Sequence, residues 1–200
     1  MKIFTLFLFL FLIVTGCSSF YREIKAHREH YKSEFLTDPR SPLTKEDLAK
    51  LDFYPPSAAS RVTATFKLTP TAEPFEMPTY SGVTRTYRKW GEAKFLWHGD
   101  TASLAIYQNM TLFSNPLYAD YLFLPFKDET NSVTTYGGGR YLNMSKADTE
   151  DGSIVIDFNK SYNPWCAYSD GFNCPIPPKE NHLPFSVEAG ERSYKGEIKH

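Results

Sequence analysis

The sequence predicts a mainly β fold of the α+β class. We expect an antiparallel β meander that closes into a barrel or sandwich, with one or two N-terminal helices and a long irregular C-terminal segment. From Arg61 onward, short runs with a hydrophobic period of two recur between turn residues. Aromatic residues make up 16% of the chain, including 13 Tyr and 16 Phe, and they favour strands. Helical spacing is confined to the residues before the first of these runs.

The N-terminal residues have the pattern of an export signal. Lys2 precedes an apolar run over residues 3–14, which is too short to span a bilayer. Val-Thr-Gly-Cys at positions 14–17 resembles the lipobox of bacterial lipoproteins, in which the Cys thiol is lipidated and the Cys becomes the first mature residue. We therefore interpret residues 1–16 as a signal peptide, Cys17 as the lipidation site, 17–21 as a tether and 22–200 as a single globular β-rich domain. The alternative is an ordinary cleaved signal with an incidental Cys17.

The N-terminal region and the overall charge of the chain also indicate where the protein is located and which partners it binds. Ser18 stands where the lipoproteins retained in the enterobacterial inner membrane have Asp. This favours an exported protein, held by its lipid anchor at the outer membrane and facing the periplasm or the cell surface. The chain has 22 Lys and Arg against 23 Asp and Glu, without a basic block, so nucleic acid is not expected as a partner. No cofactor is predicted, and protein partners are left open.

Two helices are expected before the strands. Apolar side chains at three- and four-residue steps predict a helix over 20–36, which Pro39 and Pro42 end. Thr44 can cap a second, short helix, with Asp47 at its third position. Glu23, His27, His30 and Glu34 share one face of the first helix. We expect a solvated face beside the tether rather than a cation site.

Strands are expected at 62–68, 84–89, 93–97, 102–109, 121–126, 133–136, 140–142 and 154–158. The turn at 98–100 makes a hairpin of the third and fourth, and the prolines between 70 and 78 mark an irregular link. Residues 159–178 are dense in Asn, Tyr, Pro and Cys and show no period. A long irregular stretch in a compact domain is usually functional or held by a disulfide.

Cys166 and Cys174 are the two cysteines besides Cys17. An even pair in an exported domain predicts a disulfide, with a reduced structural pair as the main alternative. Their separation fits none of the usual Cys-x2-Cys zinc patterns, so a disulfide is favoured over a metal site with His182 and Glu180. A nucleophilic Cys166–His182 pair would lack an evident third residue to orient it.

Several phrases resemble the bacterial family labelled domain of unknown function 1684. They are Ser-Pro-Leu (41–43), Phe-Leu-Pro-Phe-Lys-Asp-Glu-Thr (123–130), Thr-Tyr-Gly-Gly-Gly-Arg-Tyr-Leu (135–142), Asp-Phe-Asn (157–159), Tyr-Asn-Pro-Trp-Cys-Ala-Tyr (162–168), Cys-Pro-Ile-Pro-Pro (174–178), Glu-Asn-His-Leu (180–183) and Ala-Gly-Glu (189–191). The similarity covers about residues 28–192. The resemblance implies membership of that family and no activity.

A group of polar residues in these phrases forms the candidate site. The candidate catalytic or ligand-binding residues are Asp128, Arg140, Asp157, Asn159, Asn163 and Glu191. Asp157 and Asn159 are two apart on a strand and so share a face. Arg140 follows three glycines and suits bidentate binding of a carboxylate or phosphate. The competing interpretation, which we weight more heavily than catalysis, is that these groups stitch loops together through buried hydrogen bonds.

The preferred interpretation is a lipid-anchored envelope protein that binds a small polar or amphipathic ligand. Its pocket would be built from the 137–140 loop and the 157–163 segment. The first alternative is a hydrolase that uses Asp157, Arg140 and Glu191 in the same pocket. The second is a structural or assembly protein of the envelope. Convergence of these residues in one concave, partly exposed pocket distinguishes the first two from the third.

Overall fold

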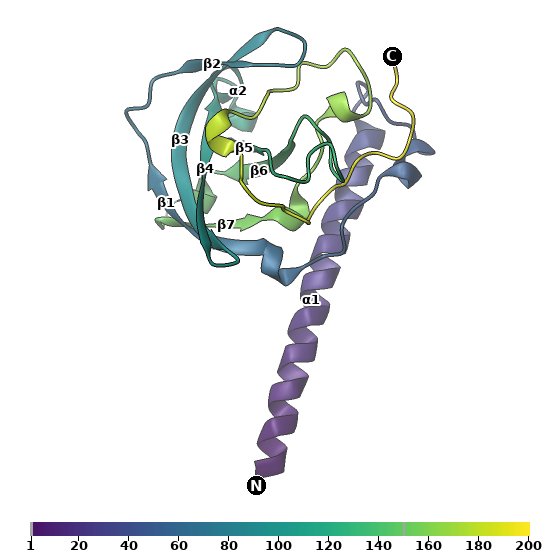
Figure 1. Cartoon of the computed structure of the whole chain (residues 1–200), viewed down its shortest axis with the longest axis vertical. Coiled ribbons are helices and arrows are strands. Elements are labelled where there is room, and N and C mark those ends of the chain that lie inside the picture. Colours follow the sequence, from purple (N-terminus) through teal and green to yellow (C-terminus); the bar gives the residue numbers. More distant parts are fainter. Residues whose placement is uncertain (1, 150) are drawn as a thin grey trace.

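The computed structural model describes the backbone of residues 2–149 and 151–200, and the side chains from residue 19 onward within those ranges. The side chains of the predicted signal segment and of Cys17 therefore lie outside the described part. Within the described residues, no helix has both the length and the apolar character needed to cross a membrane. The chain forms a curled sheet with one long helix along its side (Figure 1).

Helix α1 spans Lys2–Thr37 and contains the predicted helix over 20–36. Its last turn leads into Asp38, whose N–H donates to the Glu34 carbonyl, and Pro39 follows. The second predicted helix is only a 3₁₀ turn, η1 (Asp47–Lys50), although Asp47 accepts from the Thr44 amide and hydroxyl as expected. The structure adds a one-turn helix, α2 (Met110–Phe113), which Asn109 caps.

The sheet is antiparallel throughout, which confirms the predicted fold class. Its strands are β1 (Arg61–Leu68), β2 (Phe75–Pro78), β3 (Thr84–Trp97), β4 (Asp100–Asn109), β5 (Tyr121–Phe126), β6 (Arg140–Ser145) and β7 (Ser153–Asp157). The strand order is β6-β5-β4-β3-β1-β7, and β2 adds to β3. Within the described residues β6 and β7 do not pair with each other. The sheet thus curls into a half-barrel that stays open between its two end strands.

Three predicted boundaries are wrong. The expected strands at 84–89 and 93–97 are one strand, because its pairing with β4 continues on both sides of a bulge between Lys89 and Gly91. A Cβ at Gly91 would lie 2.2 Å from the Phe66 ring, so the bulge needs glycine. The proline-rich link contains strand β2. Residues 133–136 form a turn, in which the amides of residues 133–135 all donate to the Thr130 carbonyl.

Both faces of the sheet are covered. The face inside the curl carries the main core, including Phe95, Leu104, Leu124 and Ile156. The other face carries an aromatic group that includes Tyr87, Tyr107, Phe123 and Tyr141. The β3 bulge explains why Tyr87 and Phe95, both odd-numbered, lie on opposite faces.

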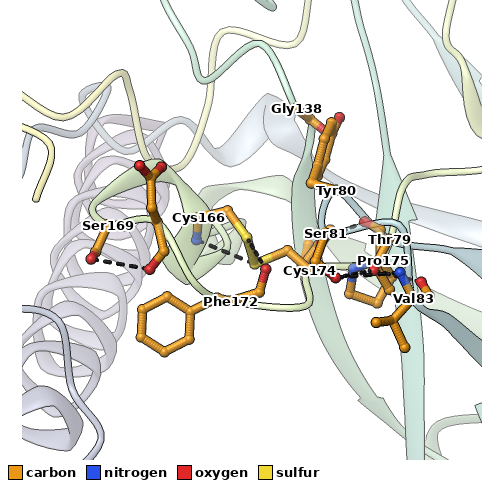
Figure 2. Close-up of a disulfide and its surroundings, with 12 residues drawn as sticks. Thr79, Tyr80, Ser81, Val83, Gly138, Cys166, Ser169, Phe172, Cys174 and Pro175 are labelled. Atoms are coloured by element: carbon orange, nitrogen blue, oxygen red, sulfur yellow. Dashed lines mark hydrogen bonds between the residues drawn. A yellow bond between two sulfur atoms is a disulfide. The ribbon is translucent and has the colours of Figure 1, made fainter. Parts of the chain in front are cut away.

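The segment after β7 packs against the sheet with almost no regular structure. Cys166 and Cys174 are joined in a disulfide, with their Cα atoms 6.2 Å apart. Beside it, Cys174 accepts from the Tyr80 amide, and Pro175 bridges to Thr79 (Figure 2). The disulfide thus lies where the irregular segment meets the end of β2.

Candidate functional site

Arg140 and Asp128 form an ion pair in the protein interior. Arg140 Nη2 lies 2.7 Å from Asp128 Oδ2, and both side chains are completely shielded from solvent. Asp128 Oδ1 also accepts from the Thr130 amide and from the Val187 amide. Removing such charges from water is costly unless their polar atoms are hydrogen-bonded. Here, other groups of the protein supply hydrogen bonds to both charged side chains.

The Arg140 guanidinium also holds the C-terminal segment. Nη2 donates to the Val187 carbonyl at 2.8 Å, and Nη1 donates to the carbonyls of Ala189 and Glu191. These carbonyls belong to a buried stretch outside any strand, so they need such a donor. Gly190 makes the close packing possible: its φ is +74°, and a Cβ there would lie 2.0 Å from Ser161 Oγ.

Glu191 extends this network to helix α1. Its carboxyl group is fully buried and accepts from the hydroxyls of Tyr31 and Tyr168 and from the Asn163 amide. Tyr31 and Tyr168 also contact each other, oxygen to oxygen, at 2.9 Å. With Glu191 protonated, the three O–H groups close a ring in which each donates once. With Glu191 ionised, both tyrosines donate to it and their mutual contact lacks a hydrogen.

Burial raises the pKa of Glu191 from 4.5 to about 7, while the hydrogen bonds from Asn163, Tyr168 and Tyr31 oppose the rise. The Arg28 guanidinium on α1 is close enough to Glu191 for the two charges to interact. The ring geometry and the pKa therefore both favour the neutral acid below pH 7.

The side chains of Asn163 and Asn159 also form hydrogen bonds with backbone groups inside the protein. The Asn163 side chain donates to the Arg192 carbonyl at 2.8 Å. Asn159 accepts from the Ser57 amide and donates to the Ser57 carbonyl, both at 2.8 Å, as a strand neighbour would. Asp157 accepts from the Asn159 amide and pairs with Arg61 at 2.7 Å.

Four of the predicted site residues, Asp128, Arg140, Asn163 and Glu191, are thus brought together in a buried network, and Asp157 and Asn159 form a separate pair. Arg140, Asn163 and Glu191 are fully buried and Asp128 nearly so. Arg140, from the predicted pocket wall at 137–140, is covered by the C-terminal segment and does not line the groove described next. Asp157 is the member of the predicted set that lines a groove at the protein surface.

That groove has a volume of about 850 Å3 and lies between α1 and the open side of the half-barrel. Helix α1 contributes Glu23, His27, His30, Tyr31, Glu34 and Phe35. The end strands contribute Leu142, Asn143 and Met144 from β6, and Val155 and Asp157 from β7. The gap between β6 and β7 is therefore what leaves room for the groove.

One part of the groove is a charged network. Arg61 pairs with both Glu23 and Asp157 at 2.7 Å, and Lys160 pairs with Glu23 at 2.8 Å. The hydrogen bonds from Lys160 and Arg61 lower the pKa of Glu23, so it stays ionised. Burial lowers the pKa of His27, and the Lys160 charge lowers it further. His27 is therefore neutral at pH 7.

The rest of the groove is aromatic. The ring centroids of Tyr31 and Tyr162 are 5.8 Å apart, and those of Phe35 and Trp165 are 6.3 Å apart. The sequence patterns placed Tyr31 and Phe35 on the apolar face of a helix, but gave no signal for Trp165. These walls come from segments more than a hundred residues apart, which no local pattern connects.

The groove has the composition of a binding site, with aromatic and apolar walls and a few charged groups. Within the described residues, no group of three or more His, Cys, Asp or Glu side chains is placed to hold a metal ion. The three residues of the hydrolase alternative do not meet, because Arg140 and Glu191 are buried while Asp157 lines the groove.

Comparison with known proteins places the chain in a family. The sequence model described as "Protein of unknown function (DUF1684)" matches residues 46–192. The chain belongs to this family. The resemblance inferred from the sequence phrases is thereby confirmed.

The DUF1684 chain is also similar to a solved structure, the solution NMR structure of an uncharacterised protein of Haloarcula marismortui. The two share 30% identity with a TM-score of 0.68, over 89% of this chain and 96% of the other. The comparison with curated proteins found no match. The similarity supports the fold and gives the DUF1684 protein no activity.

The Glu191 network predicts a pH-dependent stability. Because the pKa in the folded state lies above its unfolded value, the contribution of Glu191 to stability is complete below pH 4.5 and is lost as the pH rises towards 7. Glu191→Gln should keep the ring, with its amide N–H replacing the acid O–H. We expect the free energy of unfolding of the variant, relative to the natural protein, to rise by roughly 3 kcal/mol between pH 4.5 and pH 8.

Urea unfolding at the two pH values measures this difference. Glu188→Gln is the matched control, because it makes the same substitution at an exposed position of the same segment, outside the buried network. A Glu191→Gln difference that is the same at both pH values would contradict a raised pKa of Glu191 in the folded protein.

Proposed function

We propose that this protein is an exported lipoprotein, anchored to a membrane through Cys17, which binds a small amphipathic ligand in the groove beside α1. The groove carries this proposal. Its volume of about 850 Å3 lies within the range of small-molecule sites, roughly 300–1,000 Å3. It combines apolar walls at Leu142 and Val155 with the carboxyl groups of Glu23 and Asp157, as an amphipathic ligand requires.

The position of the groove on the chain fits an anchored binder. Glu23, which lines the groove, follows Cys17 by six residues on the same helix, about 9 Å along its axis. Acyl chains on Cys17 contribute about 0.8 kcal/mol per buried methylene and would hold the domain at a membrane. The groove would then open close to the membrane surface, and we favour the outer membrane because Ser18 follows Cys17.

The buried network supports a scaffold role for the other predicted residues. Arg140 and Glu191 bind backbone and α1, so their loss would weaken the fold and the groove wall together. We therefore assign ligand contact to Asp157 and the groove residues, and positioning to Arg140, Asp128, Asn159, Asn163 and Glu191.

Mass spectrometry of the N-terminal peptide tests the anchor. In protein extracted from the membranes of a Gram-negative host, the peptide should begin at Cys17 and carry acyl chains. Cys17→Ala should abolish incorporation of labelled palmitate. An unmodified peptide that begins elsewhere than Cys17 contradicts the anchor.

Native mass spectrometry of a periplasmic, unlipidated 18–200 protein tests the groove. We expect an excess mass that is lost on denaturation. Val155→Trp should remove it, because Val155 is half-exposed on β7 and an indole there fills the groove. Leu96→Trp, on an exposed site of β3, is the control that should retain it. An excess mass that survives Val155→Trp would place the ligand elsewhere.

A further inference from the structure

The groove carries a surplus of negative charge. Its acidic residues are Glu23, Glu34, Asp38, Asp148 and Asp157, and its Lys and Arg residues are Lys160 and Arg61. Among the lining residues the carboxylates thus outnumber the cations by three, and by two when Arg40, which binds Asp38, is counted as well. Burial lowers the pKa of His27, and the one other imidazole of the lining, His30, could not balance the surplus on its own.

The two cations of the groove are already engaged. Arg61 binds Glu23 and Asp157, and Lys160 binds Glu23, all at 2.7 or 2.8 Å. An anionic ligand would have to displace these carboxylates to reach either cation, so the charged network disfavours an anion.

Two of the carboxylates have no Lys or Arg partner in the described part of the chain. Glu34 faces only His30, at 3.7 Å, and both side chains are largely exposed. Asp148 accepts the Ser145 amide and forms no ion pair. Asp38 differs, because Arg40 binds it at 2.7 Å. Glu34 and Asp148 are therefore available to a cation that enters the groove.

The aromatic wall points to the same ligand chemistry. Tyr and Trp ring faces attract cations through their quadrupole. The Arg40 guanidinium lies 5.7 Å from the ring centroid of Trp165. The ring of this wall therefore already interacts with one cation. Leu142, Met144 and Val155 supply an apolar surface beside it.

We propose that the ligand of the groove is a small organic cation with an apolar body, such as an alkyl or aryl amine. Its ammonium group interacts with the carboxylates of Glu34 and Asp148, and its apolar body packs on β6, β7 and Trp165. This inference rests on the proposed ligand-binding function and names the ligand class.

Three octyl compounds that differ only in the head group test the proposal. Octyltrimethylammonium, octyl glucoside and octanesulfonate are titrated into the unlipidated protein below their micelle-forming concentrations, with binding followed by calorimetry. We expect the cation to bind at least about tenfold more tightly than the sulfonate, since two carboxylates each contribute on the order of a fewfold. The preference should shrink in 1 M salt because the charges are screened.

Charge-matched variants localise the effect. The double variant Glu34→Gln, Asp148→Asn should lose most of the cation preference while its affinity for octyl glucoside stays unchanged. The control, Glu29→Gln with Glu73→Gln, removes the same charge from exposed sites outside the groove and should keep the preference. Both variants change surface side chains, so each should remain folded.

The outcomes separate the two proposals. Equal binding of all three compounds, blocked by Val155→Trp, would overturn the cationic ligand and leave the groove as the binding site. Tighter binding of the sulfonate, or equal loss of preference in both double variants, would also overturn it. If no compound binds and native mass spectrometry finds no excess mass, the binding function itself fails.

Discussion

The guanidinium of Arg140 is the contact on which the C-terminal part of this protein depends. About forty residues after β7 pack against the sheet with only short 3₁₀ turns, so much of their buried backbone lacks ladder partners. Arg140 supplies donors to the carbonyls of Val187, Ala189 and Glu191, and Asp128 neutralises its charge while accepting the Val187 amide. A buried ion pair alone adds little stability, but its removal leaves charges and carbonyls unpaired at a cost of about 3–5 kcal/mol.

Helix α1 is tied to that contact through Glu191, in addition to its ion pairs with Arg61 and Lys160. Once Arg140 fixes the 187–191 segment, the Glu191 carboxyl group faces Tyr31 and Tyr168, and Tyr31 brings α1 against the domain. Helix α1 then stands over the opening between β6 and β7, which the curled sheet leaves unpaired. The groove is the space that remains between helix and sheet. Polar residues deep in the fold thus help to shape a surface groove that they do not reach.

Much of the fold could be predicted because its signals are local. The period of two identified β1, β4 and β5 to within two residues, and the helical spacing around Ile24 and Phe35 identified the part of α1 after residue 20. The bulge at Gly91 was missed, because its cause is the Phe66 ring on a neighbouring strand. Polar residue types indicated a site at Arg140 and Glu191, but residue type does not reveal burial. The groove depends on the spatial meeting of α1, β6 and Trp165, which only the folded chain provides.

Native-state hydrogen exchange tests this account most directly. The amides of Asn163, Val187 and Glu191 lie outside the strands. The first two donate to the carboxyl groups of Glu191 and Asp128, and the third donates to the Ser161 carbonyl in the segment that the network holds. The account predicts that they exchange as slowly as the amides of the β3–β4 core, by opening of the whole domain. The amide of Leu117, in an exposed turn, should exchange rapidly. Exchange of the first three amides at the rate of Leu117 would contradict the account, because the Arg140 contact would then not hold the C-terminal segment.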